Sequence, residues 1–323
     1  MLAIELKDKL NSQVDHAYCI SGDDAYLRGE ALSLLRGLAG VDFVEFNLSE
    51  LDGGNSNVSD IIANLSQVPF MSSRRVVVVR DFCDNISDDE VEKLGNAIVK
   101  EEDNVVVFYY SGQVPNFIKK IATVVDCNKL KDGDVKSVAL RWISERGYDI
   151  SGTAIYKLIS YTNCDLMRIK NELDKLFNYC QDTKIIDDNA VETVVSKDIE
   201  FVVFALSNAV SEKRAKDAYA ILGEAKGDIG KNLGMLTTLI NQFRRTLHVL
   251  LNKTDTKANL AKQLGISEYA VGRTLTLASK YKPVKLKAIV DKLEEVEYYF
   301  KSGKIISIDE ALFIGVAYAL ENC

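Results

Sequence analysis

The chain has 323 residues and a formal net charge of −7, with 47% apolar and 27% charged side chains. This length suits two or three domains, the composition excludes a disordered chain, and no run approaches the ~20 apolar residues of a membrane-spanning helix. Residues 1–135 hold 13 basic and 23 acidic side chains, whereas residues 240–323 hold 13 and 9. The acidic total argues against a free-standing, non-specific DNA-binding protein.

The first part of the chain alternates predicted strands and helices, which is typical of a doubly wound, mostly parallel sheet. Helices are expected after an N-cap at Ser21 or Asp23, around Ile61–Leu65, and after the capping box Ser87–Glu90. The segment Asp42–Leu48 alternates apolar and polar residues, which predicts a strand exposed on one face. The other expected strands are apolar runs, which predicts that both of their faces are buried. The expected strands are Ala17–Ser21, Asp42–Leu48, Val76–Val79, Val105–Tyr110 and Val124–Cys127.

The stretch Ser66–Arg80 joins an expected helix end to an expected strand. Pro69 cannot donate a backbone hydrogen bond and disfavours the α conformation of the residue before it, so the helix should end there. Two large apolar residues, Phe70 and Met71, follow in a connection that normally lies at the surface. On the residues alone, folding of both side chains onto the core is favoured over their presentation to a partner, because the strand begins only a few residues later.

A polar segment with a glycine, Asn128–Asp134, predicts a domain boundary, and after it the strand pattern largely disappears. We expect a first domain at 1–134, a small helical domain at 135–205 and a second helical domain at 206–323. The expected helices are Val135–Arg146, Ser151–Tyr161, Asp165–Cys180, Asp187–Val195, Phe201–Val210, Lys213–Glu224, Asn232–Leu251, Lys257–Leu264, Ser267–Lys280, Val284–Lys301 and Ser307–Leu320.

Two features mark the second helical domain. Its longest expected helix carries an apolar stripe at helical spacing, made of Leu236, Leu239, Phe243 and Leu247, which suits packing against other helices. Its last expected helix opens with the capping-box pattern Ser307–Glu310.

The turn after the first strand, Ile20–Tyr26, lies where a nucleotide-binding α/β domain would hold its phosphate loop. Such a loop needs glycines for close backbone approach to phosphate and a lysine for charge. This turn has a single glycine, no lysine and two carboxylates, Asp23 and Asp24, which would repel phosphate. We therefore expect no nucleotide site and no cofactor.

Other catalytic and metal-binding patterns are also missing from the sequence. The two histidines, His16 and His248, have no metal-binding partners at useful spacing, and no nucleophile elbow or zinc-binding helix motif occurs. Six scattered cysteines without a CxxC pair are typical of reduced thiols, which predicts a cytoplasmic protein without structural zinc or disulfides. We expect no catalytic residue and no metal ligand.

The segment 258–280 has the pattern of a helix-turn-helix: a helix, a turn at Gly265, and a second helix capped by Ser267. The second helix offers Arg273 and Lys280 but few other side chains that read bases. Ordinary helical packing is therefore favoured over DNA recognition.

A set of short motifs occurs in one order along the chain and resembles the delta subunit of the bacterial DNA polymerase III clamp loader. The most distinctive is Asn171–Tyr179, Asn-Glu-Leu-Asp-Lys-Leu-Phe-Asn-Tyr, which is similar to a helix in the family's second domain. The stretch Ser66–Arg80 is similar to the family's Pro-Phe-Phe or Leu-Phe turn followed by arginine and an apolar strand. The other motifs are Ser21–Tyr26, Gln242–Arg244, Ala261–Gly265 and Lys301–Gly303.

The resemblance implies a fold and a function. The fold would be an α/β AAA+-like N-terminal domain, with a parallel sheet and a degenerate nucleotide site, followed by two all-α domains, the last forming part of a pentameric collar. The chain would be a non-catalytic subunit of the polymerase III holoenzyme, a nucleotidyltransferase complex, that binds and opens the ring-shaped sliding clamp. Other clamp-loader subunits would hydrolyse ATP and complete the hetero-pentamer, and primer-template DNA would be met through the assembled complex.

The resemblance also implies a clamp-binding site. The family's apolar wedge corresponds to Phe70 and Met71, following Pro69, and this favours exposure of the two side chains. Two positions depart from the family pattern: Met71 stands where a second aromatic residue is common, and Glu297 stands where the family tends to have aspartate. Assembly with the other subunits is expected to use residues 206–323, through the apolar stripe.

Two functions of other classes stay open at this point. One is an active AAA+ ATPase switch, against which the missing lysine argues. The other is a DNA-binding regulator that uses residues 258–280. Binding of labelled ATP by the isolated chain, or sequence-specific binding of duplex DNA by its C-terminal domain, would favour these functions over a clamp-loader subunit.

Overall fold

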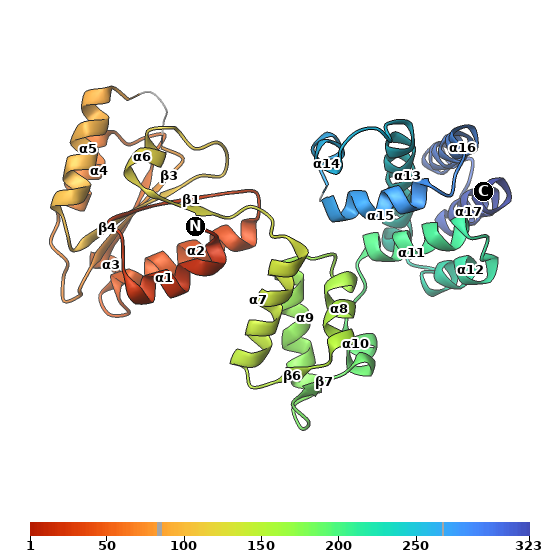
Figure 1. The fold of residues 1–323 in the computed structure, drawn as a ribbon, viewed down its shortest axis with the longest axis horizontal. Coiled ribbons are helices and arrows are strands. Elements are labelled where there is room, and N and C mark those ends of the chain that lie inside the picture. The colour runs from red at the N-terminus through yellow and green to blue at the C-terminus, as the bar shows by residue number, and fades with distance from the viewer. Residues whose placement is uncertain (83–85, 267) are drawn as a thin grey trace. The chain divides into compact units, whose positions relative to one another are not determined.

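The computed structural model describes residues 1–82, 86–266 and 268–323. The chain divides into two compact units, Met1–Lys131 and Asp132–Cys323 (Figure 1). The division falls inside the polar segment Asn128–Asp134.

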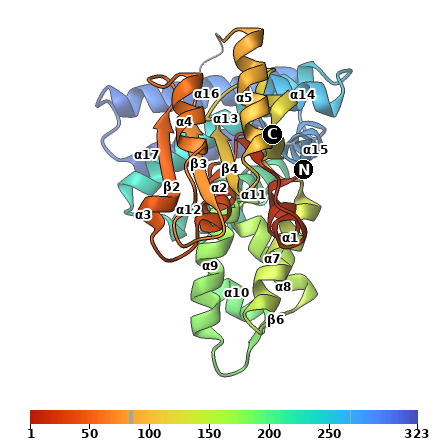
Figure 2. The same cartoon turned by 90° about the vertical axis from the view of Figure 1, so that its left-hand side faces the viewer.

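The first unit is built on a five-stranded parallel sheet with the strand order β2-β3-β4-β1-β5. In this order β3 and β4 are interior strands, and Val76 of β3 pairs with Val105 of β4. Figure 2 shows β2, β3 and β4 side by side, with α3 near the end of β2. The strands are β1 (Ala17–Ser21), β2 (Leu48–Asp52), β3 (Arg75–Arg80), β4 (Asn104–Tyr109) and β5 (Thr123–Asp126).

Helices cover both faces of this sheet (Figure 1). Because side chains alternate along a strand, Val77 and Val79 of β3 point to the same face, where they pack against α4 and α5. Val76 and Val78 point to the opposite face and are also fully buried, on the side where α2 contacts β1 and β4. The helical segments of this unit are η1 (Ala3–Glu5), α1 (Leu6–Ser12), α2 (Ala25–Arg36), η2 (Gly37–Ala39), α3 (Val44–Asn47), α4 (Val58–Leu65), α5 (Asp88–Lys100) and α6 (Ile118–Ile121).

One predicted strand of this unit is wrong. The segment 42–48 contains the short helix α3, and the neighbouring strand β2 begins only at Leu48. The alternation of apolar and polar residues was misleading because Phe43 takes a left-handed conformation, with φ 55°, and starts a helical turn instead of continuing an extended chain.

Helix caps follow the sequence at some positions and depart from it at others. The capping box of Ser87 and Glu90 at the start of α5 is confirmed. The N-cap of α2 is Asp24, whose carboxylate accepts the Leu27 N–H at 3.0 Å, and not Ser21 or Asp23. In the second unit Ser307 occupies the N-cap of α17 without a side-chain cap bond, so the capping box predicted there is wrong.

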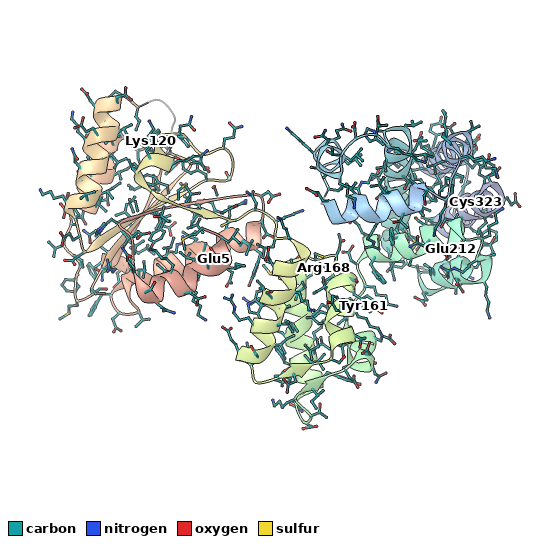
Figure 3. The ribbon with its side chains drawn as sticks, in the orientation of Figure 1. Glu5, Lys120, Tyr161, Arg168, Glu212 and Cys323 are labelled. Atoms are coloured by element: carbon teal, nitrogen blue, oxygen red, sulfur yellow. The ribbon has the colours of Figure 1, made fainter. Side chains whose placement is uncertain are left out.

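The second unit begins with four helices and a small parallel two-stranded sheet that the sequence did not predict. Tyr161 at the end of α8 and Arg168 on α9 (Figure 3) contact the residues that begin α11. The Arg168 guanidinium pairs with the Asp198 carboxylate, and the ring of Tyr161 lies 4.7 Å from that of Phe201. These elements are α7 (Asp132–Glu145), β6 (Asp149–Ile150), α8 (Gly152–Tyr161), α9 (Leu166–Tyr179), β7 (Ile185–Ile186) and α10 (Asp188–Val194).

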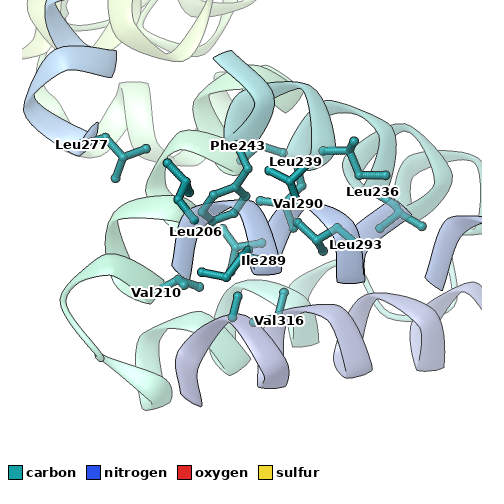
Figure 4. Packing of buried hydrophobic residues seen from close by; sticks show 14 of the residues in the cluster. Leu206, Val210, Leu236, Leu239, Phe243, Leu277, Ile289, Val290, Leu293 and Val316 are labelled. Atoms are coloured by element: carbon teal, nitrogen blue, oxygen red, sulfur yellow. The ribbon is translucent and has the colours of Figure 1, made fainter. Parts of the chain in front are cut away.

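The remaining seven described helices share one apolar core (Figure 4). The predicted stripe lies within it: Leu236, Leu239 and Phe243 of α13 are almost fully buried against α11, α16 and α17. The helices are α11 (Ile199–Ser211), α12 (Ala215–Glu224), α13 (Ile229–Leu251), α14 (Lys257–Leu264), α15 (Glu268–Ala278), α16 (Pro283–Lys301) and α17 (Ile308–Asn322). The stripe therefore holds this bundle together and is not available as a surface for assembly. The boundary predicted between residues 205 and 206 falls inside α11.

Candidate functional site

The connection between α4 and β3 exposes two apolar side chains. Between Leu65, where α4 ends, and Arg75, where β3 begins, Phe70 is 48% and Met71 78% exposed. Pro69 before them is partly buried. Met71 takes a left-handed conformation, with φ 50°, which is uncommon for a residue other than glycine. The structure therefore does not have the arrangement favoured by the residues alone, in which both side chains fold onto the core.

Phe70 lies against two further exposed phenylalanines, which come from the α3 segment. Phe43 and Phe46 are 44% and 53% exposed. The ring of Phe70 lies 5.4 Å from that of Phe43, edge to face, and 5.2 Å from that of Phe46, distances at which aromatic rings attract one another. We call Phe43, Phe46, Phe70 and Met71 the aromatic patch. Grouped exposed apolar side chains of this kind mark surfaces that bind other proteins.

The part of the patch that α3 contributes is not predicted by the alternating pattern of residues 42–48. The spacing of Phe43 and Phe46, three residues apart, places both side chains on one side of a helical turn. This three-residue spacing is the sequence signal for a shared surface. In the strand predicted from the alternating pattern, the two rings would lie on opposite faces.

A buried asparagine holds the two segments of the patch together. Asn47, the last residue of α3, has no exposed surface. Its Oδ1 accepts the N–H of Phe70 at 2.7 Å, and its Nδ2 donates to the carbonyl oxygen of Phe70 at 2.8 Å and to that of Phe43 at 3.3 Å. The side chain thus satisfies both backbone polar groups of Phe70.

Arg75 secures the far end of the same connection. Its buried guanidinium donates to the carbonyl oxygens of Asn64, at 3.1 Å, and Phe46, and to Ser49 Oγ at 2.6 Å. These bonds tie the first residue of β3 to α4, α3 and β2. Burial lowers the pKa of the Arg75 guanidinium, because a charged group loses hydration there. The hydrogen bonds to its N–H groups compensate for that loss.

Asn104, the first residue of β4, holds the early part of the connection. Its Nδ2 donates to the carbonyl oxygens of Leu65 and of Gln67, the latter at 3.0 Å, and its Oδ1 accepts the Arg75 N–H at 3.3 Å. Asn47, Arg75 and Asn104 are all buried. Phe70 and Met71 are therefore carried on a connection that buried polar side chains fix at several points.

The turn after β1 has its backbone donors occupied by the protein itself. The N–H of Asp23 donates to Asn128 Oδ1 at 3.2 Å, and that of Asp24 donates to the Cys127 carbonyl at 3.0 Å. Gly22, with φ 144°, packs so closely that an added Cβ would lie 2.1 Å from the backbone of Cys127. A phosphate-binding loop offers free N–H groups, whereas this turn is closed over the segment that follows β5.

Within the described ranges, the structure brings together no three His, Cys, Asp or Glu residues that could hold a metal ion. The His248 ring instead pairs with the side chain of Gln263, with Nε2 and Oε1 2.9 Å apart. The same described residues include no helix that is both long and apolar enough to cross a membrane.

The helix-turn-helix pattern forms α14, a left-handed turn at Gly265, and α15, which packs against α13. The predicted cap Ser267 lies outside the described residues. The guanidinium of Arg273, which would have been a base-reading group, lies 3.5 Å from the centre of the Phe204 ring on α11. Val271 and Leu277 of α15 are fully buried, so this face of the helix serves packing.

Comparisons with known proteins agree with this architecture. DNA polymerase III subunit delta from Bacillus subtilis is 21% identical over 316 residues, which cover 92% of this chain and 91% of the relative. A probable DNA polymerase III subunit delta from Aquifex aeolicus is 24% identical over 196 residues, covering 56% and 55%. The structure of the Bacillus subtilis DNA clamp loader delta protein superimposes with a TM-score of 0.79 at 21% identity, over 99% of this chain and 100% of that one. The expected architecture, an α/β domain with a parallel sheet followed by helices, is confirmed.

Sequence models of one family match both ends of the chain. The model described as "DNA polymerase III, delta subunit" matches residues 18–128. The model described as "DNA polymerase III delta subunit, C-terminal domain" matches residues 200–313. Together the two matched ranges span well over half of the 323 residues. The chain therefore belongs to the family of DNA polymerase III delta subunits.

Proposed function

We propose that this chain binds the sliding clamp through the aromatic patch and opens the clamp ring during replication. The observation that carries the proposal is the exposure of Phe70 and Met71 on a connection held by buried Asn47, Arg75 and Asn104. An exposed side chain on a fixed backbone can enter a pocket of a partner with little loss of conformational entropy.

The chemistry of the patch suits an apolar pocket. Aromatic residues and methionine are enriched in the cores of protein interfaces, and a few such anchors supply most of the binding energy. Phe70 and Met71 are the proposed anchors, Pro69 directs the chain into the turn, and Phe43 and Phe46 enlarge the apolar surface beside them. Methionine is flexible and adapts its shape to a pocket, so Met71 can fill space that an aromatic side chain would otherwise occupy.

We further propose that the chain acts within a hetero-pentamer whose other subunits hydrolyse ATP. Residues 1–134 would bind the clamp, residues 135–205 would link the domains, and residues 206–323 would form part of the collar. Because the stripe of α13 is buried within its own bundle, collar contacts would use exposed side chains. Tyr219 and Phe313 are candidates, since their stacked rings, with centroids 5.1 Å apart, are 38% and 52% exposed. Primer-template DNA would be met by the assembled complex.

The direct test is capture of the cognate sliding clamp by the tagged full-length chain. Wild type should retain the clamp, and the Phe70→Ala, Met71→Ala double variant should not. A matched control is the Phe313→Ala, Met167→Ala double variant, because these residues are the same types at 52% and 48% exposure in the second unit. Loss of capture in the control, or its survival in the patch variant, would overturn the proposal.

A further inference from the structure

The amide of Asn47 is the direct hydrogen-bonded link between the two segments of the aromatic patch. It bonds the N–H of Phe70 at 2.7 Å, the carbonyl of Phe70 at 2.8 Å and the carbonyl of Phe43 at 3.3 Å. These two phenylalanines are separated by 27 positions along the chain, as their numbers show, and they belong to different connections. One side chain therefore sets the distance between their backbones.

Phe70 needs such a bond, because regular secondary structure does not hold it. The residue lies between α4 and β3, and within the described ranges no backbone–backbone hydrogen bond involves it. The neighbouring anchors bond groups other than those of Phe70: Ser72 Oγ donates to the Ala39 carbonyl at 3.0 Å, and the Arg75 guanidinium donates to the carbonyl oxygens of Phe46 and Asn64. The bonds from Asn47 thus restrict the backbone rotation at Phe70 and, with it, the direction of the Phe70 ring.

We propose that Asn47 is a positioning residue for clamp binding. It does not touch the clamp, since it has no exposed surface. It fixes the ring of Phe70 between Phe43 and Phe46, so that the patch has its binding shape before the partner arrives. This inference rests on the proposed function, because it takes the aromatic patch as the clamp-binding surface.

The Asn47 bonds should strengthen clamp binding because they reduce the conformational entropy of the connection before the clamp binds. A connection without the Asn47 bonds samples several backbone conformations, and binding must then select one of them, which lowers the apparent affinity in proportion to the population of the competent state. A buried amide that bonds both backbone polar groups of one residue, and so two successive peptide groups, removes most of that freedom before binding. Asn47 should therefore influence clamp affinity only through Phe70 and its neighbours in the patch.

A double-mutant cycle on the full-length chain tests this. Clamp affinity is measured by titration for wild type, Asn47→Ala, Phe70→Ala and the combined variant. We expect Asn47→Ala to weaken binding by about tenfold in the wild-type background and by less than about twofold in the Phe70→Ala background, because interacting sites are not additive. Equal losses in both backgrounds, or no loss in wild type, would overturn the proposal.

Two further variants separate positioning from general stability. Tyr18→Phe removes the hydrogen bond that the Tyr18 hydroxyl accepts from the Asp15 N–H, 2.8 Å long, in the same unit, and Tyr18 takes no part in the hydrogen bonds from Asn47 to Phe70. It should lower the melting temperature and leave clamp affinity unchanged; an equal affinity loss would mean that destabilisation alone explains the effect of Asn47→Ala. Asn47→Ser keeps a small polar side chain that is too short to bond both backbone groups of Phe70, so it should show the same non-additivity and is the second variant if Asn47→Ala does not fold.

The outcomes also separate this inference from the proposed function. If Phe70→Ala binds the clamp as tightly as wild type, the aromatic patch is not the binding surface and the proposed function fails. If Phe70→Ala weakens binding and Asn47→Ala does not, the patch stands and only the positioning role of Asn47 is refuted.

Discussion

Truncation of Phe70 and Met71 to alanine should reduce clamp affinity strongly and folding stability only moderately. Fully burying a side chain of this size contributes ~1.5–3 kcal/mol. Phe70 keeps about half of its surface in water and Met71 more than three quarters, at 48% and 78% exposure. The double variant should therefore lose ~2 kcal/mol of unfolding free energy, whereas two fully buried side chains of these types would lose at least ~5 kcal/mol.

The expected affinity loss is much larger than that stability loss. Two interface anchors that contribute ~2 kcal/mol each would together lower affinity by ~100-fold or more, at ~1.4 kcal/mol per tenfold change. Titration of the fluorescently labelled clamp with each variant measures this loss. Urea unfolding followed by circular dichroism measures stability on the same preparations.

Clamp affinity and unfolding free energy together distinguish a binding surface from a buried core position. The Phe313→Ala, Met167→Ala control should lose at least as much stability, because Met167 is 48% exposed where Met71 is 78% exposed, and it should retain clamp affinity. A patch variant that loses several kcal/mol of stability while its folded fraction still binds the clamp would refute the reasoning.

Four other outcomes follow from the structure. The isolated chain should bind no ATP, and Asp24→Lys should create no turnover, because the backbone donors of that turn are bonded within the protein; micromolar binding in equilibrium dialysis would contradict this. Arg75→Ala should lose ~3 kcal/mol of unfolding free energy in urea, since it removes a buried charged donor from several acceptors; a loss below ~1 kcal/mol would refute that role. Burial raises the pKa of Cys19 and of Cys127 from 9.0 to about 12, so both thiols should resist alkylation at pH 8 in peptide mass mapping, and stability should fall as the pH rises from about 9 towards 12, where only the unfolded thiols ionise. Removal of residues 199–323 should abolish assembly with other clamp-loader subunits in size-exclusion chromatography, and the truncated chain should still bind the clamp.

The sheet could be predicted from the sequence because two of its interior strands, β3 and β4, are rich in consecutive valines. Four consecutive valines in β3 and a similar run in β4 leave no exposed face, and only a strand covered on both sides has that pattern. Helices were also well located, since their apolar spacing and caps are local signals. The strand predicted at 42–48 is wrong because Phe43 takes a left-handed conformation, which residue types alone do not predict.

The site was predicted only in part. The resemblance to the family predicts an exposed Phe70 and Met71, whereas the residues alone favour the burial of both side chains. Asn47 and Arg75 could not be identified as anchors, because their partners lie in other connections and become neighbours only when the sheet forms. The apolar stripe of α13 shows the reverse difficulty, since helical spacing identifies a packing face but does not say whether the partner helix belongs to the same chain.

The most direct test of the central claim is site-specific photocrosslinking within the complex of the full-length chain and the sliding clamp. A benzophenone amino acid replaces Met71, which is 78% exposed, and, in a separate protein, Val284 of α16, which is 83% exposed. If the aromatic patch binds the clamp, position 71 should crosslink to the clamp and position 284 should not. A complex that forms normally but crosslinks from position 284 and not from position 71 would contradict it.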